Sequence, residues 1–542
     1  MKGKNIVLVG IKNTENLGIG YLASVLNSAG YNVRIYCHND FNDEILEVLR
    51  EEDPVIVGFS VVYQYYIDTF INLVKFLREQ GIAAHFTAGG HYPSLKYREL
   101  FSFTNALDSI VRFEGEYTLL ELADCISSGR DWRHIKGIAF KCGDEIITNP
   151  LRTFEKDLDK FPFPVRPPLR DYGFGKKFAT IIAGRGCIHS CSFCNLREFY
   201  RQSKGPYKRI RRPEMVVKEM DYLYKENRCS VFLFEDDDFP VKTSYGSEWI
   251  KEFCKELSQK GLSDKILWKI NCRADEIEED LFALMKSNGL YMVFIGIDDG
   301  TNEGLRSLNK HITVDKNLEG ISILKKFGIG FDYGFMLFQP VTTFSTLGKN
   351  LDFLLQLCHD GYNTVMFNKL RPYYETRVEK ELVEAGRMKG LPGYFDYDFI
   401  EESMNDYYNF ITDCFMDWLR DTEGVVNLSR WARIYCLVYN HYNRVTDEVL
   451  KTEKEISDFI AESNHFILDS MKELSAVFES GQYISDKRLL KRFRIKIKSR
   501  QSYFVKQIND SVSKLFSIYN YMDLESLYNL VKYATPGFSY NK

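Results

Sequence analysis

The sequence predicts an α/β protein in three parts: a doubly wound parallel sheet, an incomplete (β/α)6 barrel and a mostly helical C-terminal domain. Two stretches in which β-rich and amphipathic runs alternate support this prediction, and the Pro-rich segment 161–168 separates them. Beyond about residue 371 the β-rich runs end and helical, aromatic segments follow. We therefore expect domains at residues 1–135, 176–370 and 371–542, with a hairpin and a linker at 136–175.

The first part contains four apolar, β-forming runs that alternate with amphipathic runs. The apolar runs are Ile6–Val9, Val33–Cys37, Val55–Phe59 and Ala83–Ala88. This alternation is typical of βαβ units and predicts a Rossmann-like sheet, which binds ligands at the carboxyl ends of its strands. Gly89-Gly90-His91 follows the fourth run, where two glycines would let a bulky ligand approach the backbone. A plain strand-to-loop turn is an equal alternative.

The rest of the first part leads from a fifth strand to the linker. Residues 108–112 form a strand that runs into Glu114-Gly115-Glu116, and acids are favoured at the N-terminus of a helix. Residues 136–149 predict a hairpin about Gly143-Asp144. The Pro-rich segment 161–168 cannot continue a helix or a central strand, so we expect a linker there.

The second part begins with the strand Phe178–Ala183. Five further β-rich runs follow: Val231–Phe234, Leu267–Cys272, Tyr291–Ile297, Gly330–Leu337 and Asn363–Leu370. Six βα units predict a partial TIM-like barrel, whose chemistry collects at the carboxyl ends of the strands. The informative residues at these ends are Glu235-Asp236-Asp237-Asp238, Asn271, Arg273, Asp298-Asp299-Gly300-Thr301 and Phe338-Gln339-Pro340.

The acidic residues at these strand ends have two interpretations each. Four consecutive acids at 235–238 repel one another, so some must meet a cation, a metal or hydrogen-bond donors, unless they form a solvated helix cap. Asp298 could cap a helix that begins near Asn302, or it could accept hydrogen bonds from vicinal hydroxyls, as acids after strands do in nucleotide sites.

Three cysteines lie at spacing C-x3-C-x2-C on one loop, at Cys187, Cys191 and Cys194. Thiolates this close can converge on one metal centre, and Gly184 and Gly186 free the backbone to wrap it. A structural zinc site would need a fourth ligand, yet the nearest other cysteines are at positions 142 and 229. The loop therefore predicts a cubane iron–sulfur site with one iron left open, and buried thiols are the weaker alternative.

The composition is that of an ordinary globular chain. The net charge of −4 gives no indication of binding to nucleic acids or membranes, so we expect neither partner. No apolar run reaches eighteen residues, and the N-terminus predicts a strand rather than a secretory signal. Twelve cysteines, most of them isolated in apolar segments, indicate reduced core thiols. These features predict a cytoplasmic protein.

Two basic runs could suggest nucleic-acid binding, at residues 208–212 and 487–500. The second run is punctuated by one apolar face, which is made of Leu489, Leu490, Phe493, Ile495 and Ile497. We therefore favour a solvated basic face with a buried apolar side for 487–500, and a solvated basic face for 208–212.

These motifs carry a family resemblance. The loop Gly186-Cys187-Ile188-His189-Ser190-Cys191-Ser192-Phe193-Cys194 resembles the signature of radical S-adenosylmethionine (SAM) enzymes. Residues 234–239 resemble their acidic motif, and Gly296-Ile297-Asp298-Asp299-Gly300-Thr301 resembles Gly-Ile-Glu-Ser-Gly-Ser, with Asp for Glu and the first Ser, and Thr for the last.

The first part is similar to the cobalamin-binding domain that precedes the barrel in one branch of these enzymes. The similarity rests on Gly20-Tyr21-Leu22-Ala23, Val57-Gly58-Phe59-Ser60, Gly89-Gly90-His91 and Glu114-Gly115-Glu116. The D-x-H-x-x-G signature of many cobalamin domains is absent. This fits cobalamin without a lower histidine ligand, or a domain that kept the fold and lost the cofactor.

The resemblance implies a role for each matched residue. Cys187, Cys191 and Cys194 would hold a [4Fe-4S] cluster whose fourth iron SAM chelates, with Phe193 beside the adenine. Asp236 and Asp237 would accept hydrogen bonds from the methionine ammonium, and Asp298 and Asn271 from the ribose hydroxyls. Arg273 or the Phe338 segment would complete the SAM pocket. The cobalamin contacts would be Ser60, Gly89, Gly90, His91, Glu114 and Gly115.

The activity implied is methyl transfer to an unactivated carbon, or a phosphinate phosphorus, of a small molecule. It would use a 5′-deoxyadenosyl radical and methylcobalamin, with an external electron donor such as flavodoxin or ferredoxin. Radical cyclisation, ring contraction or rearrangement without methylation is the alternative on the same scaffold. An electron-transfer or sensing protein without catalysis is the alternative of another class, although a carrier cluster usually has four cysteines.

Overall fold

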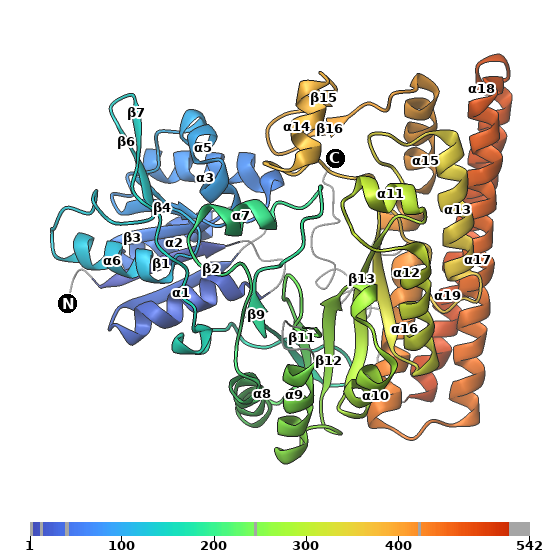
Figure 1. The fold of residues 1–542 in the computed structure, drawn as a ribbon, viewed down its shortest axis with the longest axis horizontal. Helices are drawn as coiled ribbons and strands as arrows, with labels where there is room; N and C mark the ends of the chain where they lie inside the picture. The colour runs from blue at the N-terminus through green and yellow to red at the C-terminus, as the bar shows by residue number, and fades with distance from the viewer. Residues whose placement is uncertain (1–3, 11–14, 38–42, 243–246, 421–423, 520–542) are drawn as a thin grey trace. The chain divides into compact units, whose positions relative to one another are not determined.

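The computed structural model describes residues 4–10, 15–37, 43–242, 247–420 and 424–519 (Figure 1). The chain divides into two compact units. The first unit comprises residues 1–168, 183–215 and 371–397. The second comprises residues 169–182, 216–370 and the chain from 398 onward. The cysteine loop therefore belongs to the same unit as the N-terminal sheet.

The first unit is built on a seven-stranded sheet. In spatial order its strands are β2 (Asn32–Cys37), β1 (Asn5–Gly10), β3 (Ile56–Ser60), β4 (His85–Gly89), β5 (Ser109–Val111), β6 (Ile138–Cys142) and β7 (Glu145–Thr148). The first five run parallel, and the hairpin β6–β7 adds two antiparallel strands at one edge. The predicted hairpin is thus confirmed, but it extends the sheet rather than forming part of a linker.

Helices cover both faces of this sheet, because side chains alternate between the faces along each strand. Ile6 and Leu8 of β1 face a core that includes α1 (Leu17–Ser28) and α6 (Glu116–Ser127). Val7 and Val9 face the opposite core. That side carries α2 (Asp43–Glu52), α3 (Ile67–Glu79), α4 (His91–Leu95) and α5 (Tyr97–Phe103). The doubly wound fold is confirmed.

Short elements complete the first unit. They are η1 (Gln64–Tyr66), η2 (Leu158–Lys160), β9 (Gly184–Arg185), α7 (Leu196–Gln202), β10 (Arg209–Ile210), α14 (Arg377–Glu384), β15 (Met388–Lys389) and β16 (Asp396–Tyr397). Helix α8 (Pro213–Asn227) begins in the first unit and continues into the second.

The second unit contains a five-stranded parallel sheet. In spatial order its strands are β14 (Gly330–Phe335), β13 (Leu290–Asp298), β12 (Leu267–Cys272), β11 (Cys229–Phe234) and β8 (Lys177–Ile181). The connecting helices are α9 (Glu248–Gln259), η3 (Ala274–Glu276), α10 (Glu279–Ser287), α11 (Asn302–Ser307), α12 (Val314–Lys326) and α13 (Phe344–Cys358). This is the expected open barrel with one strand fewer.

The predicted sixth strand, residues 363–370, forms only an isolated bridge between Phe338 and Lys369. Its end bonds to backbone, since the Asn368 N–H donates to the Phe335 carbonyl at 2.8 Å and the Leu370 N–H to the Phe338 carbonyl at 2.7 Å. Earlier in the run, side chains take the amides that a longer strand would need. The Asn464 side chain accepts from the Val365 N–H at 2.9 Å, and the Tyr333 hydroxyl accepts from the Met366 N–H at 3.0 Å. The run is therefore paired through its backbone only near residues 368–370, and the periodicity of its sequence could not reveal this.

The C-terminal region is helical, as predicted. Its helices are α15 (Glu402–Arg420), α16 (Val425–Tyr442), α17 (Asp447–Glu479), α18 (Gln482–Ser485) and α19 (Lys487–Ile518). The two long helices α17 and α19 lie side by side (Figure 1). Residues of α16, α17 and α19 share one core with Val231, Leu267 and Met292 of the parallel sheet. The helical region and the barrel sheet are therefore one body.

Candidate functional site

The cysteine loop lies between the short strand β9 and helix α7. Strand β9 pairs antiparallel with β10, with Gly184 opposite Ile210. Gly186 has a φ of +88°, and a Cβ there would lie 1.7 Å from the Tyr207 carbonyl oxygen. Only glycine fits this position, so the glycine fixes where the loop leaves the strand.

The three loop cysteines differ from most other thiols of the chain. Cys187, Cys191 and Cys194 are all partly exposed, whereas seven of the twelve cysteines are buried, and none of the twelve forms a disulfide in the described chain. Burial raises the pKa of Cys254 and Cys358 to about 12, which keeps them protonated and inert. The His189 N–H points to Cys187 Sγ at 3.5 Å, as a donor to a thiolate would. The loop thus offers three accessible thiols.

Buried ion pairs join the strands beside the loop to the end of the N-terminal sheet. Arg209 donates to the two carboxylate oxygens of Glu114 at 2.8 and 2.5 Å. Arg185 donates to Glu116 at 2.7 Å. The side chain of Arg209 is only 2% exposed, so each charge depends on its partner. The Glu114 carboxylate is therefore directed at arginines.

The basic run 208–212 is not the solvated face that its composition predicts. Arg209 and Arg211 are 3% and 4% exposed, and Arg211 pairs with Asp159. That prediction is wrong for these two residues, because acids distant in the sequence neutralise them inside the first unit.

Segment 371–379 also contacts the loop within the first unit. The Val378 N–H donates to the Ser192 carbonyl at 3.3 Å. On its other side the Gln64 side chain donates to the Pro372 carbonyl at 3.4 Å and accepts from the Tyr374 N–H at 3.3 Å. The segment thus links the loop to the turn that follows β3.

The residues predicted at the carboxyl end of the first sheet do meet there. Ser60 pairs with Gly89 across β3 and β4, and β5 lies next to β4. Gly90 has a φ of +107°, and a Cβ there would lie 2.8 Å from the Val61 carbonyl oxygen. His91 begins α4 and contacts the Phe199 ring edge-to-face at 4.3 Å.

This edge stays accessible although the strands behind it are buried. All six predicted contact residues are partly exposed: Ser60, Gly89, Gly90, His91, Glu114 and Gly115. Three of the six are glycines, so much of the edge consists of backbone. A flat, bulky ligand can therefore approach this edge closely.

In the second unit, Asn271 organises the acidic turn that follows β11. Its side-chain amide donates to the backbone carbonyl groups of Phe234 and Asp236, both at 3.4 Å. Its backbone carbonyl accepts from the Phe239 N–H at 3.1 Å. Asp236 is buried and Asp237 is exposed. The four acids are therefore not a uniformly solvated cap.

Asp298 and Asp299 have different partners. Asp298, at the end of β13, has a φ of +68° and forms a buried ion pair with Lys310. Asp299 accepts hydrogen bonds from Thr301 and from the Gln339 side chain at 2.6 Å. Thr301 is the residue that caps α11, so the alternative role of Asp298 as a helix cap is excluded.

Two other residues predicted at the SAM site, Arg273 and Phe338, contact neighbouring protein side chains. Arg273 donates to both carboxylate oxygens of Asp275, at 2.9 and 3.0 Å. The Phe338 ring is 1% exposed and packs against the rings of Phe367, Phe399, Tyr407 and Tyr408. The Phe338 segment is the predicted alternative to Arg273 for completing the SAM pocket; the Phe338 side chain itself belongs to this aromatic core. Phe193, between Cys191 and Cys194 on the loop, is half-exposed.

Sequence reasoning missed Lys310, Arg185, Glu116 as an ion-pair partner, and the tyrosines after β3. Lys310 follows Asp298 by twelve residues with no local signal. The tyrosines did have a signal, since residues 61–66 read Val-Val-Tyr-Gln-Tyr-Tyr directly after a buried strand.

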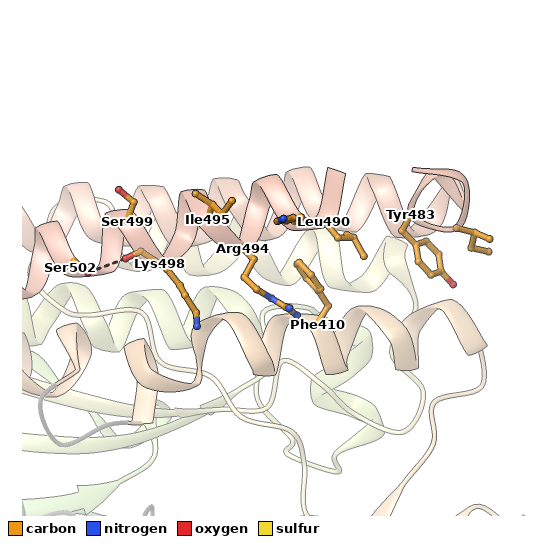
Figure 2. A pocket seen from close by; sticks show the side chains of 10 residues that line it. Phe410, Tyr483, Leu490, Arg494, Ile495, Lys498, Ser499 and Ser502 are labelled. Carbon is orange, nitrogen blue, oxygen red and sulfur yellow. Dashed lines mark hydrogen bonds between the residues drawn. The ribbon is translucent and has the colours of Figure 1, made fainter. Parts of the chain in front are cut away.

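A groove in the helical region contains none of the predicted site residues. It has a volume of about 1070 Å³ and is lined by residues of α15, α18 and α19, including Phe410, Tyr483, Leu490 and Ile495. Figure 2 shows Arg494 extending from α19 toward Phe410. Ile495 is 61% exposed and Ile497 is buried, which corrects the prediction that both lie on one buried face.

The basic residues of α19 mostly face solvent or neighbouring acids. Arg494, Lys496 and Arg500 pair with Asp413, Glu473 and Glu462 on α15 and α17. These contacts agree with a solvated basic face. Among the described residues, no helix has the length and apolar character needed to cross a membrane.

Comparison with known proteins gives two family matches. The radical SAM superfamily matches residues 181–354, and the B12 binding domain matches residues 6–123. An uncharacterized methyltransferase from Pyrococcus horikoshii is 26% identical over 373 residues, which cover 67% of this chain and 77% of that protein. The anaerobic magnesium-protoporphyrin IX monomethyl ester cyclase of Rubrivivax gelatinosus is 28% identical over 64% of this chain, but over only 63% of its own length.

A solved structure shares the fold along nearly the whole chain. The cobalamin-dependent S-adenosylmethionine radical enzyme OxsB, with aqua-cobalamin bound, has a TM-score of 0.70 at 17% identity, over 98% of this chain and 84% of that one.

The residues present fit the cofactors of these families. Three accessible thiols on one loop suit a cluster with an open iron. The edge at β3–β5 suits cobalamin, because the six predicted contact residues are partly exposed and three of them are glycines. The [4Fe-4S] cluster, SAM and cobalamin are accordingly its cofactors. The chain belongs to the radical SAM enzymes that carry a cobalamin-binding domain.

Proposed function

We propose that this enzyme transfers a methyl group to an unactivated carbon, or a phosphinate phosphorus, of a small molecule. One observation carries the proposal: the cysteine loop and the glycine edge of the N-terminal sheet belong to one compact unit, joined by the Arg209–Glu114 and Arg185–Glu116 ion pairs. A reaction that needs two cofactors to act on one atom requires such a fixed arrangement.

The cofactors supply the reactive chemistry: the cluster provides an electron for SAM cleavage, and cobalamin provides the methyl group. Cys187, Cys191 and Cys194 would hold the cluster, and their accessibility leaves room for SAM. Phe193, between the last two cysteines, would contact the adenine. Ser60, Gly89, Gly90, His91 and Gly115 would hold the cobalamin.

Glu114 and Glu116 have a bracing role in this proposal. Their carboxylates hold Arg209 and Arg185, on the two strands that flank the loop. Because these groups are largely buried, moving either strand would separate charges in a poorly solvated place. The two ion pairs therefore keep the three thiols in position relative to the sheet.

The acids that follow β11 and β13 would orient SAM. Asp236 and Asp237 would accept hydrogen bonds from the methionine ammonium, and such bonds are charge-assisted. Asn271 fixes the backbone of their turn through the carbonyls of Phe234 and Asp236. Asp298, whose charge Lys310 neutralises, would accept a hydrogen bond from a ribose hydroxyl.

The products decide between methylation and the other radical reactions. Anaerobic holoenzyme is supplied with reductant, a filtered pool of small metabolites and SAM that carries a ¹³C-labelled methyl group. We expect a product heavier by one labelled CH2 unit and formation of S-adenosylhomocysteine. The formation of 5′-deoxyadenosine without S-adenosylhomocysteine would instead indicate cyclisation or rearrangement, as in the cyclase relative. No SAM cleavage at all would indicate a non-catalytic cluster protein.

We also propose that an external one-electron donor of the flavodoxin or ferredoxin type reduces the cluster. Reduced flavodoxin should replace dithionite in the SAM-cleavage assay. A cluster that accepts electrons from dithionite but from neither carrier would contradict this choice of partner.

A further inference from the structure

We propose that Tyr63, Tyr65, Tyr66, Tyr373 and Arg371 form a binding surface for a substrate with a planar π-system and an anionic group. This inference rests on the proposed function and names the class of its substrate. The five residues are called the tyrosine surface below, and all of them belong to the first unit.

Three of the tyrosines come directly after β3. The rings of Tyr63 and Tyr65 are stacked, with centroids 5.2 Å apart and an interplanar angle of 11°. Tyr66 contacts Tyr65 at 4.6 Å. Tyr63 is 47% exposed, and Tyr65 and Tyr66 are partly exposed. The strand end that carries Ser60 therefore continues into a row of accessible aromatic faces.

Segment 371–374 fixes the other side of this surface. Besides the two hydrogen bonds from Gln64, the Tyr374 hydroxyl donates to the Val62 carbonyl at 3.3 Å. Tyr374 is 2% exposed and packs edge-to-face on buried Tyr92 at 5.0 Å. These contacts anchor the segment, so the positions of its neighbours Arg371 and Tyr373 are fixed relative to Tyr65.

The same cluster contains a core part and a surface part. Tyr92 and Tyr374 are almost completely buried and serve packing. The five residues of the tyrosine surface remain partly exposed, although three of them are aromatic neighbours in sequence. A cluster that served only packing would bury these rings, because each ring contributes most when it is removed from water.

Arg371 adds a positive charge to this aromatic surface. Arg371 and Tyr373 flank Pro372, whose carbonyl accepts a hydrogen bond from Gln64, the neighbour of Tyr65, at 3.4 Å. The phenol groups of Tyr65 and Tyr373 can donate hydrogen bonds. Segment 371–379, which carries Arg371 and Tyr373, contacts the cysteine loop through the Val378 N–H and the Ser192 carbonyl at 3.3 Å. The surface thus adjoins the cysteine loop.

These groups recognise one kind of molecule. Tyrosine faces stack on planar rings, and a guanidinium binds carboxylate or phosphate in a planar, bidentate way. Phenol donors beside the guanidinium add hydrogen bonds to the same anion. The matching ligand therefore has a flat unsaturated ring system and a carboxylate or phosphate.

Three probes separate the two parts of this recognition. Indole-3-acetate is planar and anionic, indole is planar and neutral, and cyclohexylacetate is anionic without a planar ring. Binding to the anaerobic holoenzyme is followed by ligand-detected NMR titration. We expect the affinity order indole-3-acetate, then indole, then cyclohexylacetate. An absence of indole-3-acetate binding, or equal affinity for all three probes, would overturn the proposal.

Two pairs of variants locate the binding. Tyr63→Ala should weaken indole-3-acetate at least fivefold, whereas Tyr63→Phe should retain it. Tyr394→Ala, which removes another tyrosine of the first unit that is 49% exposed, is the control. Arg371→Gln should weaken indole-3-acetate at least fivefold and leave indole unchanged. Its control is Arg377→Gln, which removes an exposed arginine that pairs with Glu381.

Folding and function are tested separately from the surface. Cofactor content and thermal unfolding verify that each variant is folded, and Tyr63→Phe gives a result even where Tyr63→Ala is unstable. If the probes bind as expected and no labelled methyl product forms, the proposed methyl transfer is contradicted, and the tyrosine surface is still supported as a binding surface. If methylation occurs and Tyr63→Ala and Arg371→Gln bind indole-3-acetate like the parent, the surface fails and the function stands.

Discussion

The carboxyl ends of the two parallel sheets are built in opposite ways. At β3–β5 the edge consists largely of glycine backbone, with Gly90 at φ +107°. At β11–β14 the edge carries acids whose surroundings are polar: Asn271 holds the acidic turn, and Lys310 neutralises Asp298. A bare backbone edge suits a large flat ligand, and preorganised acids suit a small ligand with ammonium and hydroxyl groups. Position alone, at a strand end, does not determine what a sheet binds.

The largest effect is expected from the cysteine loop. Replacing Cys191 by Ala removes one of three ligands, so iron content and SAM cleavage should fall to background. Cobalamin content should change little, because the glycine edge is untouched. Cys142→Ala, at an exposed cysteine outside the loop, is the control and should keep its iron. Full iron content in Cys191→Ala would show that the loop does not bind the cluster.

The next largest effect is expected at the polar edge. Lys310→Met leaves the Asp298 carboxylate buried without its cation, which typically costs about 3–5 kcal/mol of unfolding free energy. SAM affinity should fall and cobalamin content should not. Lys316→Met removes an exposed pair with Glu319 and should cost no more than about 1 kcal/mol.

Denaturant unfolding and SAM titration measure these two changes. The double variant Asp298→Asn with Lys310→Met should recover part of the lost stability, because the uncompensated charge is gone. If Lys310→Met is as stable as the parent protein, the ion pair does not organise this edge.

Gly90→Ala tests the glycine edge. A Cβ there would lie 2.8 Å from the Val61 carbonyl oxygen in a backbone region reserved for glycine, so we expect a cost of roughly 3 kcal/mol and loss of bound cobalamin. Gly129→Ala also has a positive φ, +67°, but nothing lies within 4 Å, so it should cost only about 1 kcal/mol. Absorbance of the purified proteins measures cobalamin. Equal cobalamin in the two variants would contradict the assignment of the edge.

The smallest effect concerns pH. Burial lowers the pKa of His85 at the start of β4 to about 4, below its ordinary value of 6.5. The neutral ring, bonded to Ser109 at 2.8 Å, contributes stability above pH 6.5 that is lost as the pH falls toward 4. The free energy of unfolding of the first unit should therefore drop by roughly 2 kcal/mol over this range.

His85→Gln should flatten this pH dependence, as measured by denaturant unfolding with a probe in the first unit. An unchanged slope between pH 6.5 and 4 would assign the acid sensitivity to other groups.

Local patterns in the sequence predicted the fold class and part of the site. Strand alternation predicted the doubly wound sheet, and the three-cysteine spacing identified the loop. The same patterns failed where a distant side chain decides the outcome. Residues 363–370 have the composition of a strand, but Asn464 and Tyr333 bind the amides of Val365 and Met366. Phe338 follows a strand like the other predicted contacts, but it is packed among four rings.

The sequence by itself determined the elements and their chemistry, because backbone periodicity, glycine positions and thiol spacing act within a few residues. Only the tertiary structure decided which elements belong together. It joined Arg209 to Glu114 across 95 residues and Tyr374 to Val62 across 312. It also paired Asp298 with Lys310 in a buried place. Such pairings depend on packing and on the cost of burying a charge alone, and neither leaves a trace in local sequence.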